Sequence, residues 1–152
     1  MMIHARDVGL PEHAPSLVPV AHVWIAREIA ASGDRDEAIS MMRQAVSELH
    51  RAERIGWEVC STSVFVETLL ERGEDGDLAE AQIEIDRMMN AQSDPGSAML
   101  DLTLLRLRAL TARTRGHDAD SEDLVNRYRT MATSLGFEGH IARAEAMAAD
   151  FD

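Results

Sequence analysis

The stretch SGDRDEAISMMRQAV, from Ser32 to Val46, decides how the rest of the sequence is interpreted. Gly33 can adopt the left-handed conformation that ends a helix, and the side chain of Asp34 can cap the helix that follows. Glu37 stands three residues after Asp34, as in a capping box, where it would accept the backbone N–H of the cap residue. The stretch therefore predicts the end of one helix, a tight turn and the start of a second helix.

An apolar stripe follows this cap. Its members are spaced by four, three and four residues, which places them on one face of the second helix. They are Ala38, Met42, Ala45 and Leu49. The preceding segment, Ser16–Ser32, has Ser16 as its cap and tolerates Pro19 in the first turn, where N–H groups have no acceptor within the helix. We expect the two helices to pack together as a hairpin.

The cap and the stripe return twice, at steps of 43 residues. The second copy consists of Asp77, Glu80, Ala81, Ile85 and Met88. The third consists of Asp120, Asp123, Leu124, Tyr128, Met131 and Leu135. Three copies of one pattern predict a helical repeat.

An apolar segment precedes each later copy of the cap. These segments are Val59–Leu70, ended by Gly73, and Met99–Leu110, ended by Gly116. Each repeat is therefore expected to be a helical hairpin. A last segment, Glu138–Ala149, is expected to be the capping helix that covers the open end of a repeat array.

Three links are predicted between these segments. Ile55–Glu58 and Leu135–Glu138 share a Gly–aromatic–Glu sequence, which we interpret as the same turn. The third link is Asp94–Ser97, in which Pro95 and Gly96 stop one helix and Ser97 can cap the next.

The composition also favours helices. Hydrophobic residues make up 45% of the chain and aromatic residues only 4%, which is unusual for an extensive sheet. Because Gly9, Pro11 and Pro15 interrupt any helix, we expect residues 1–15 to be an extended lead and residues 16–152 to be a single helical-repeat domain. The expected fold is all-α, an α-solenoid of about three hairpins plus a C-terminal capping helix, about seven helices in all. A compact bundle of seven helices is the alternative.

The net charge of −12 at pH 7 repels phosphate backbones and anionic lipids, so neither nucleic acid nor a membrane is an expected partner. No segment has the long apolar run of a membrane helix, and the start, MMIHARDVG, lacks the layout of a signal peptide. We therefore expect a cytoplasmic protein. Cys60 is the only cysteine, and its neighbours Val59, Val64 and Phe65 predict a buried, unreactive thiol.

The run Gly33–Ala38, followed by Met42 and Ala45, resembles the second half of a tetratricopeptide repeat. Gly76–Ala81 matches the same motif, whereas the third copy has large residues where the motif has small ones. The step of 43 residues also exceeds the roughly 34 that are usual in that family. The resemblance implies a tetratricopeptide-like solenoid built from long, divergent hairpins.

The segment Asp123–Met147 is similar to the carboxyl end of actinobacterial multidomain regulators. In those proteins a nucleotide-cyclase or LuxR-type output domain and an ATPase domain precede a tail of helical repeats. The resemblance implies a detached tail or a small stand-alone relative that serves signalling or transcription regulation. The cyclase and ATPase residues of that family have no matching positions in this chain, so neither activity carries over.

No motif for catalysis, for a metal or for a cofactor is found. The histidines lack an HExxH spacing, and no serine or cysteine lies in a nucleophile elbow. The acidic run Asp118–Asp123 lacks the central glycine and distal glutamate of a calcium loop. The glycines of Gly73–Gly76 flank two carboxylates that would repel phosphate. His140 is the histidine of most interest, and a structural role fits it better than a catalytic one.

Four arginines concentrate positive charge on one predicted helix. They are Arg106, Arg108, Arg113 and Arg115. Either they pair with neighbouring carboxylates or they form a groove for an acidic peptide. In a tetratricopeptide-like array the first helix of each hairpin would line the concave face, and five residues would then form this groove. They are Arg27, Glu67, Glu71, Arg106 and Arg113. Pairing of Arg106 or Arg113 with Glu67 or Glu71 would consume the same donors.

These patterns favour a non-enzymatic protein–protein interaction or regulatory module with a protein or peptide partner. The alternative is a sensor domain that binds a small effector between hairpins. An enzyme is disfavoured, because no acid–base pair or nucleophile can be assembled from the motifs. Stand-alone association into a homodimer is also expected, through the exposed sides of the Ser16–Ser32 helix, with Trp24, and of the last helix.

Overall fold

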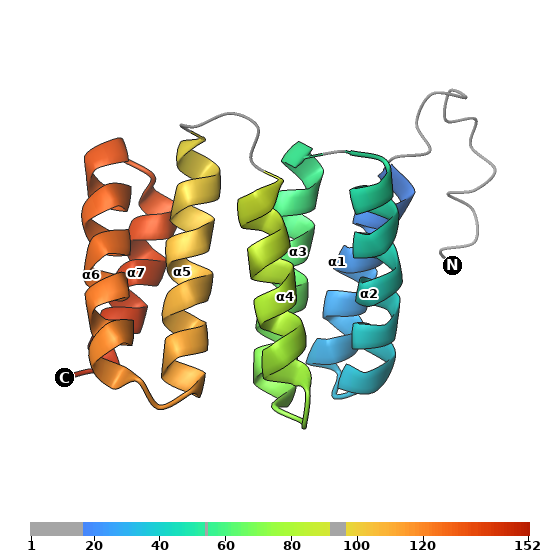
Figure 1. Ribbon diagram of the computed structural model, residues 1–152, viewed down its shortest axis with the longest axis horizontal. Coiled ribbons are helices and arrows are strands. Elements are labelled where there is room, and N and C mark those ends of the chain that lie inside the picture. Colours follow the sequence, from blue (N-terminus) through green and yellow to red (C-terminus); the bar gives the residue numbers. More distant parts are fainter. Residues whose placement is uncertain (1–16, 54, 92–96) are drawn as a thin grey trace. The chain divides into compact units, whose positions relative to one another are not determined.

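The computed structural model describes residues 17–53, 55–91 and 97–152, and the side chains of residues 55 and 56 are not part of that description. Seven helices make up these ranges, and no strand occurs within them. They are α1 (Leu17–Ala31), α2 (Arg35–Arg51), α3 (Ile55–Arg72), α4 (Asp77–Asn90), α5 (Ala98–Thr114), α6 (Asp118–Leu135) and α7 (Glu138–Ala149) (Figure 1). The all-α prediction and the predicted number of helices are confirmed for the residues that the structure describes. The solenoid arrangement and the single domain over residues 16–152 stay predictions. The lead at 1–15 and the link residues Asp94, Pro95 and Gly96 lie outside the described residues.

The chain divides into two compact units, Met1–Ser61 and Thr62–Asp152, with the boundary inside α3. In the first unit α1 and α2 form a hairpin. The predicted stripe of α2 is confirmed, because all four of its members are fully buried together with Val23 and Ala26 of α1. Burial of these side chains removes apolar surface from water and stabilises the hairpin.

The turn between α1 and α2 has only half of the predicted capping box. Gly33 has a positive φ of 111°, and the side chain of Asp34 accepts the backbone N–H of Glu37 at 3.1 Å. The backbone N–H of Asp34, however, donates to the carbonyl of Ile29 at 3.3 Å. The side chain of Glu37 therefore cannot accept this N–H as a capping box requires, because the N–H already donates to the end of α1.

The second copy of the cap differs from the prediction. Gly76, with φ of 91°, is the cap residue of α4, and Asp77 is the first residue of the helix. Asp77 is buried, and its carboxylate accepts two hydrogen bonds from Arg72, at 2.7 and 2.9 Å, and one from the backbone N–H of Glu74 at 3.0 Å. The side chain of Asp77 thus connects the end of α3 to the start of α4 through hydrogen bonds, and it does not cap α4. The predicted stripe of α4 is nevertheless confirmed, since Ala81, Ile85 and Met88 are buried.

The third copy was predicted three residues out of register. Gly116 ends α5 with a φ of 77°, and His117 is the cap residue of α6, so the predicted cap, Asp120, lies within the first turn. The residues that occupy the stripe positions of α2 are Ser121, Val125, Tyr128 and Ala132, and all are buried. The predicted end of the stripe, Leu135, is 41% exposed. A shift of three residues is close to one helical turn. Two residues of the predicted stripe, Leu124 and Tyr128, are therefore buried although the register is wrong.

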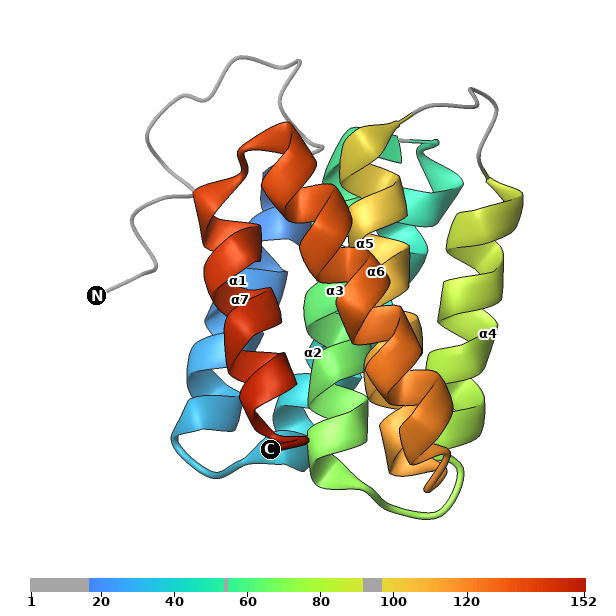
Figure 2. The ribbon, with the colours of Figure 1, turned by 90° about the vertical axis from the view of Figure 1, so that its left-hand side faces the viewer.

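In the second unit α7 packs against α6 (Figures 1 and 2). Its bounds match the predicted capping helix, Glu138–Ala149. A fully buried cluster joins α5, α6 and α7, and it consists of Leu102, Tyr128, Ala132 and Ala144. Gly136, with φ of 71°, ends α6, and Phe137 is the cap residue of α7, as expected for the Leu135–Glu138 link.

Two predictions on α3 are wrong. Ile55–Glu58 is not a turn, because α3 begins at Ile55 and Glu58 lies in its first turn. The thiol of Cys60 is exposed, not buried. Cys60 follows the exposed Trp57 by three residues, so the two share the outer side of the helix, whereas Val59 and Phe65 are buried on the other side. None of the helices in the described ranges combines the length and apolar character needed to cross a bilayer.

Candidate functional site

Arg106 of the predicted groove is engaged within the protein. It is only 6% exposed, forms an ion pair with Glu67 of α3 and donates a hydrogen bond to the hydroxyl of Ser63. Of the two interpretations offered for this arginine, intramolecular pairing is the one that the structure contains. A guanidinium that is buried and paired in this way cannot also receive a peptide without breaking the contact between α5 and α3.

Apart from Glu67, the groove residues do not contact Arg106. Arg113 pairs with Asp150, at 2.6 Å between Nη1 and Oδ2, and its guanidinium lies 6.0 Å from the ring centroid of Phe151. Arg27 belongs to the first unit, where its guanidinium lies over Trp24 at 5.5 Å from the ring centroid. Glu71 is exposed, one turn beyond Glu67 on α3. Only Glu67 and Arg106 are brought into direct contact.

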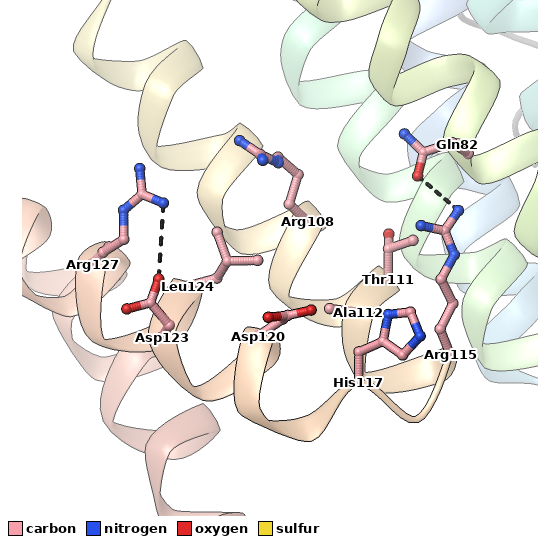
Figure 3. Close-up of a pocket in the computed structure, with 10 residues that line it drawn as sticks. All are labelled: Gln82, Arg108, Thr111, Ala112, Arg115, His117, Asp120, Asp123, Leu124 and Arg127. Carbon is pink, nitrogen blue, oxygen red and sulfur yellow. Dashed lines mark hydrogen bonds and ion pairs between the residues drawn. The ribbon is translucent and has the colours of Figure 1, made fainter.

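A polar cleft of about 410 Å³ lies in the second unit, between α4, α5 and α6 (Figure 3). Its lining is rich in charge of both signs. The lining residues are Gln82, Arg108, Thr111, Ala112, Arg115, His117, Asp120, Asp123, Leu124 and Arg127. The volume falls within the roughly 300–1,000 Å³ that is usual for ligand sites, but the lining is more polar than that of a typical small-molecule pocket.

Arg108 and Arg115 are the cationic side of the cleft on α5. They are seven residues apart, so two turns of helix place them on one side of α5 (Figure 3). Arg115 donates to the side-chain oxygen of Gln82 at 3.0 Å, a neutral partner that leaves the charge uncompensated. Arg108 is exposed and makes no ion pair with any other residue that the structure describes. The two guanidiniums therefore offer planar donor pairs to a carboxylate.

α6 contributes side chains of both signs. Asp123 and Arg127 are one turn apart, and their charged atoms approach only to 4.0 Å, which is a weak, exposed pair. Asp120 lies in the first turn of α6, near the positive end of the helix dipole. In Figure 3 the carboxylate of Asp120 extends from α6 toward α5. Asp120 forms no ion pair with the residues of the described ranges.

The lining gives no sign of an activated nucleophile. Thr111 supplies the hydroxyl of the cleft, and it donates to the carbonyl of Leu107 at 2.7 Å. Within the described part of the chain, no three histidine, cysteine or acidic side chains come together as metal ligands would. The cleft presents guanidinium donors for carboxylates and carboxylate acceptors for N–H groups.

Tyr128 and His140 form a second polar contact, at the junction of α6 and α7. The phenol oxygen lies 2.6 Å from Nδ1 of His140, and the two rings meet edge to face. Burial lowers the pKa of His140, and the nearby charges of Arg143 and Arg106 lower it further. Burial also raises the pKa of Tyr128. Both groups are thus neutral near pH 7, and the contact holds α7 on α6.

The cleft is not the groove that the sequence predicts, because none of the five predicted groove residues lines it. The sequence predicts four arginines on α5 and a groove that contains Arg106 and Arg113. The pair with the same spacing two residues later, Arg108 and Arg115, is the one that reaches the cleft. Two residues correspond to about 200° around a helix, so the two pairs face nearly opposite sides of α5. No family model, no curated protein and no solved structure matches the chain.

Proposed function

We propose that this chain is a non-enzymatic helical-repeat module that binds a protein partner through the cleft between α4, α5 and α6. One observation supports the proposal above all. Arg108 stands exposed in the cleft and makes no ion pair with the described residues, although Arg106 and Arg113 on the same helix each have an internal carboxylate. The protein has a net charge of −12. An arginine without an ion pair in a concave site of such a protein can bind a carboxylate of an acidic segment.

The expected partner segment is acidic because of the arginines in the cleft. Three guanidiniums line it, from Arg108, Arg115 and Arg127, against the carboxylates of Asp120 and Asp123. Guanidinium groups bind carboxylates through paired N–H donors, and such charge-assisted bonds are stronger than neutral ones. The resemblance to the tails of cyclase- and ATPase-containing regulators supports a signalling context for this binding. The proposed location is the cytoplasm, and nucleic acid and membranes are not proposed partners.

The experiment is a selection of displayed random peptides on the full chain. Selected peptides are then measured against the Arg108→Ala/Arg115→Ala double variant and against Arg113→Ala/Arg129→Ala, which removes the same charge outside the cleft. We expect acidic peptides to be enriched, and their affinity to fall at least about tenfold in the first variant only. Peptides that bind both variants equally well would show that the cleft is not the site.

A small-ligand sensor is the second candidate. The presence of both Asp120 and Arg108 in a cleft of about 410 Å³ favours a zwitterionic ligand, whose two charges could each find a partner. A sensor would be indicated in the same experiment if a small zwitterionic compound displaced the selected peptides and raised the melting temperature of the unaltered chain. Without such competition, the peptide interpretation holds alone.

A further inference from the structure

The carboxylates of the cleft restrict the conformation of a bound peptide. This inference rests on the proposed function and concerns the same site. Asp120 and Asp123 repel an acidic side chain. An acidic peptide that binds here therefore needs a hydrogen-bond donor for these carboxylates. Backbone N–H groups are such donors, and every peptide carries them. In a helical peptide these N–H groups are used internally, whereas in a polyproline II segment they remain free.

The spacing of the arginines is compatible with the same conformation. Seven residues of helix place the Cα atoms of Arg108 and Arg115 about 10.5 Å apart. In a polyproline II segment, residues three apart lie on the same side and are separated by about 9.3 Å. In a β-strand, residues on the same side are separated by roughly 6.6 or 13 Å, and neither value matches as well.

A phosphate group fits this cleft less well than a carboxylate. A phosphate carries close to two negative charges near pH 7, and Asp120 and Asp123 would repel it more strongly than they repel a carboxylate. It also has no N–H group to offer to Asp120. Acidic side chains on an extended backbone satisfy both signs of charge in the lining.

We propose that the cleft binds an extended acidic peptide, in which carboxylates three residues apart meet Arg108 and Arg115 and a backbone N–H between them donates to Asp120. The guanidiniums thus bind the acidic side chains, and the carboxylate of Asp120 binds the peptide backbone. Specificity comes from the spacing of the acidic residues rather than from their number.

The probe is a blocked nine-residue peptide with glutamate at every third position and serine between. Its binding to the full, ¹⁵N-labelled chain is measured by chemical-shift titration. One comparison peptide has the same composition with its glutamates in succession, and a series carries a single N-methyl group at each serine in turn. We expect the contiguous peptide to bind about tenfold more weakly, and one N-methyl position to weaken binding by a similar factor.

The Asp120→Ala variant should bind the parent peptide about tenfold more weakly. It should also bind the parent peptide and the peptide with the weakening N-methyl group equally well. Its matched control is Asp118→Ala, which removes a carboxylate from the same turn of α6 but outside the cleft lining. If neither spacing nor N-methylation matters, but binding still depends on Arg108 and Arg115, this inference is overturned and the proposed function stands. Binding that is indifferent to the two arginines, or no binding of any acidic peptide, would overturn the proposed function itself.

Discussion

At the scale of single residues, the two arginine pairs of α5 show what the sequence could and could not provide. The spacing of seven predicted correctly that members of a pair share one side of the helix. Which pair faces α3 depends on the rotation of α5 about its axis, and tertiary packing sets that rotation. Ser63 and Glu67 therefore receive Arg106, and Arg108 is left for the cleft. The internal pairing of Arg106 was among the alternatives that the sequence left open.

The contact between Tyr128 and His140 predicts a loss of stability in mild acid. The pKa of His140 is lowered in the folded protein, so the unfolded chain, with a histidine pKa of about 6.5, takes up the proton first. Its contribution to stability is present above pH 6.5 and is lost as the pH falls toward the folded-state pKa. We expect the melting temperature to drop between pH 7.5 and 5.

The control for this prediction is His140→Asn, measured over the same range of pH. Asparagine keeps a polar side chain near Tyr128 but does not titrate, so the difference between the two pH profiles isolates His140 from the other histidines. The wild-type curve should fall more steeply than that of the variant. Parallel curves would assign the acid sensitivity to other groups.

At the scale of helices, local signals made most of the elements predictable, although the start of α3 was predicted as a turn. Glycines with positive φ mark the ends of α1, α3, α5 and α6, and the apolar spacing identified the buried faces of α2 and α4. The predicted register of α6 is wrong because the turn before this helix comes three residues earlier than a fixed step of 43 residues predicts. The pair Gly116 and His117 corresponds to Gly33 and Asp34, and this glycine was the better reference point.

The register of α6 can be tested by truncating two of its side chains. Val125→Ala should lower the free energy of unfolding by about 1.5–3 kcal/mol, because Val125 is 1% exposed and truncation removes buried methyl groups. Leu135→Ala should cost about 0.5 kcal/mol or less, since Leu135 is 41% exposed. Both values come from urea denaturation at one pH. A larger loss for Leu135→Ala than for Val125→Ala would restore the predicted register.

At the scale of the whole molecule, the outer side of α1 predicts self-association. α1 is apolar around most of its circumference, and its first charged residue is Arg27. Leu17, Val18 and Trp24 are exposed, Trp24 to 48%. Leu17 and Trp24 are seven residues apart and share one side of the helix, so a second copy could cover both through a two-fold contact. Burying this side against another copy would remove apolar surface from water, which favours a homodimer.

Light scattering over a series of protein concentrations measures this association directly. We expect the mass of the wild-type chain to rise toward that of a dimer, and Trp24→Glu to remain monomeric because each interface would then bury two unpaired carboxylates. Trp57→Glu is the matched control: it makes the same substitution at a tryptophan that is 51% exposed on α3. Loss of the dimer in Trp24→Glu alone would locate the contact on α1. A wild-type chain that stays monomeric at every concentration would refute the prediction, and a Trp24→Glu variant that still forms the dimer would place the contact elsewhere.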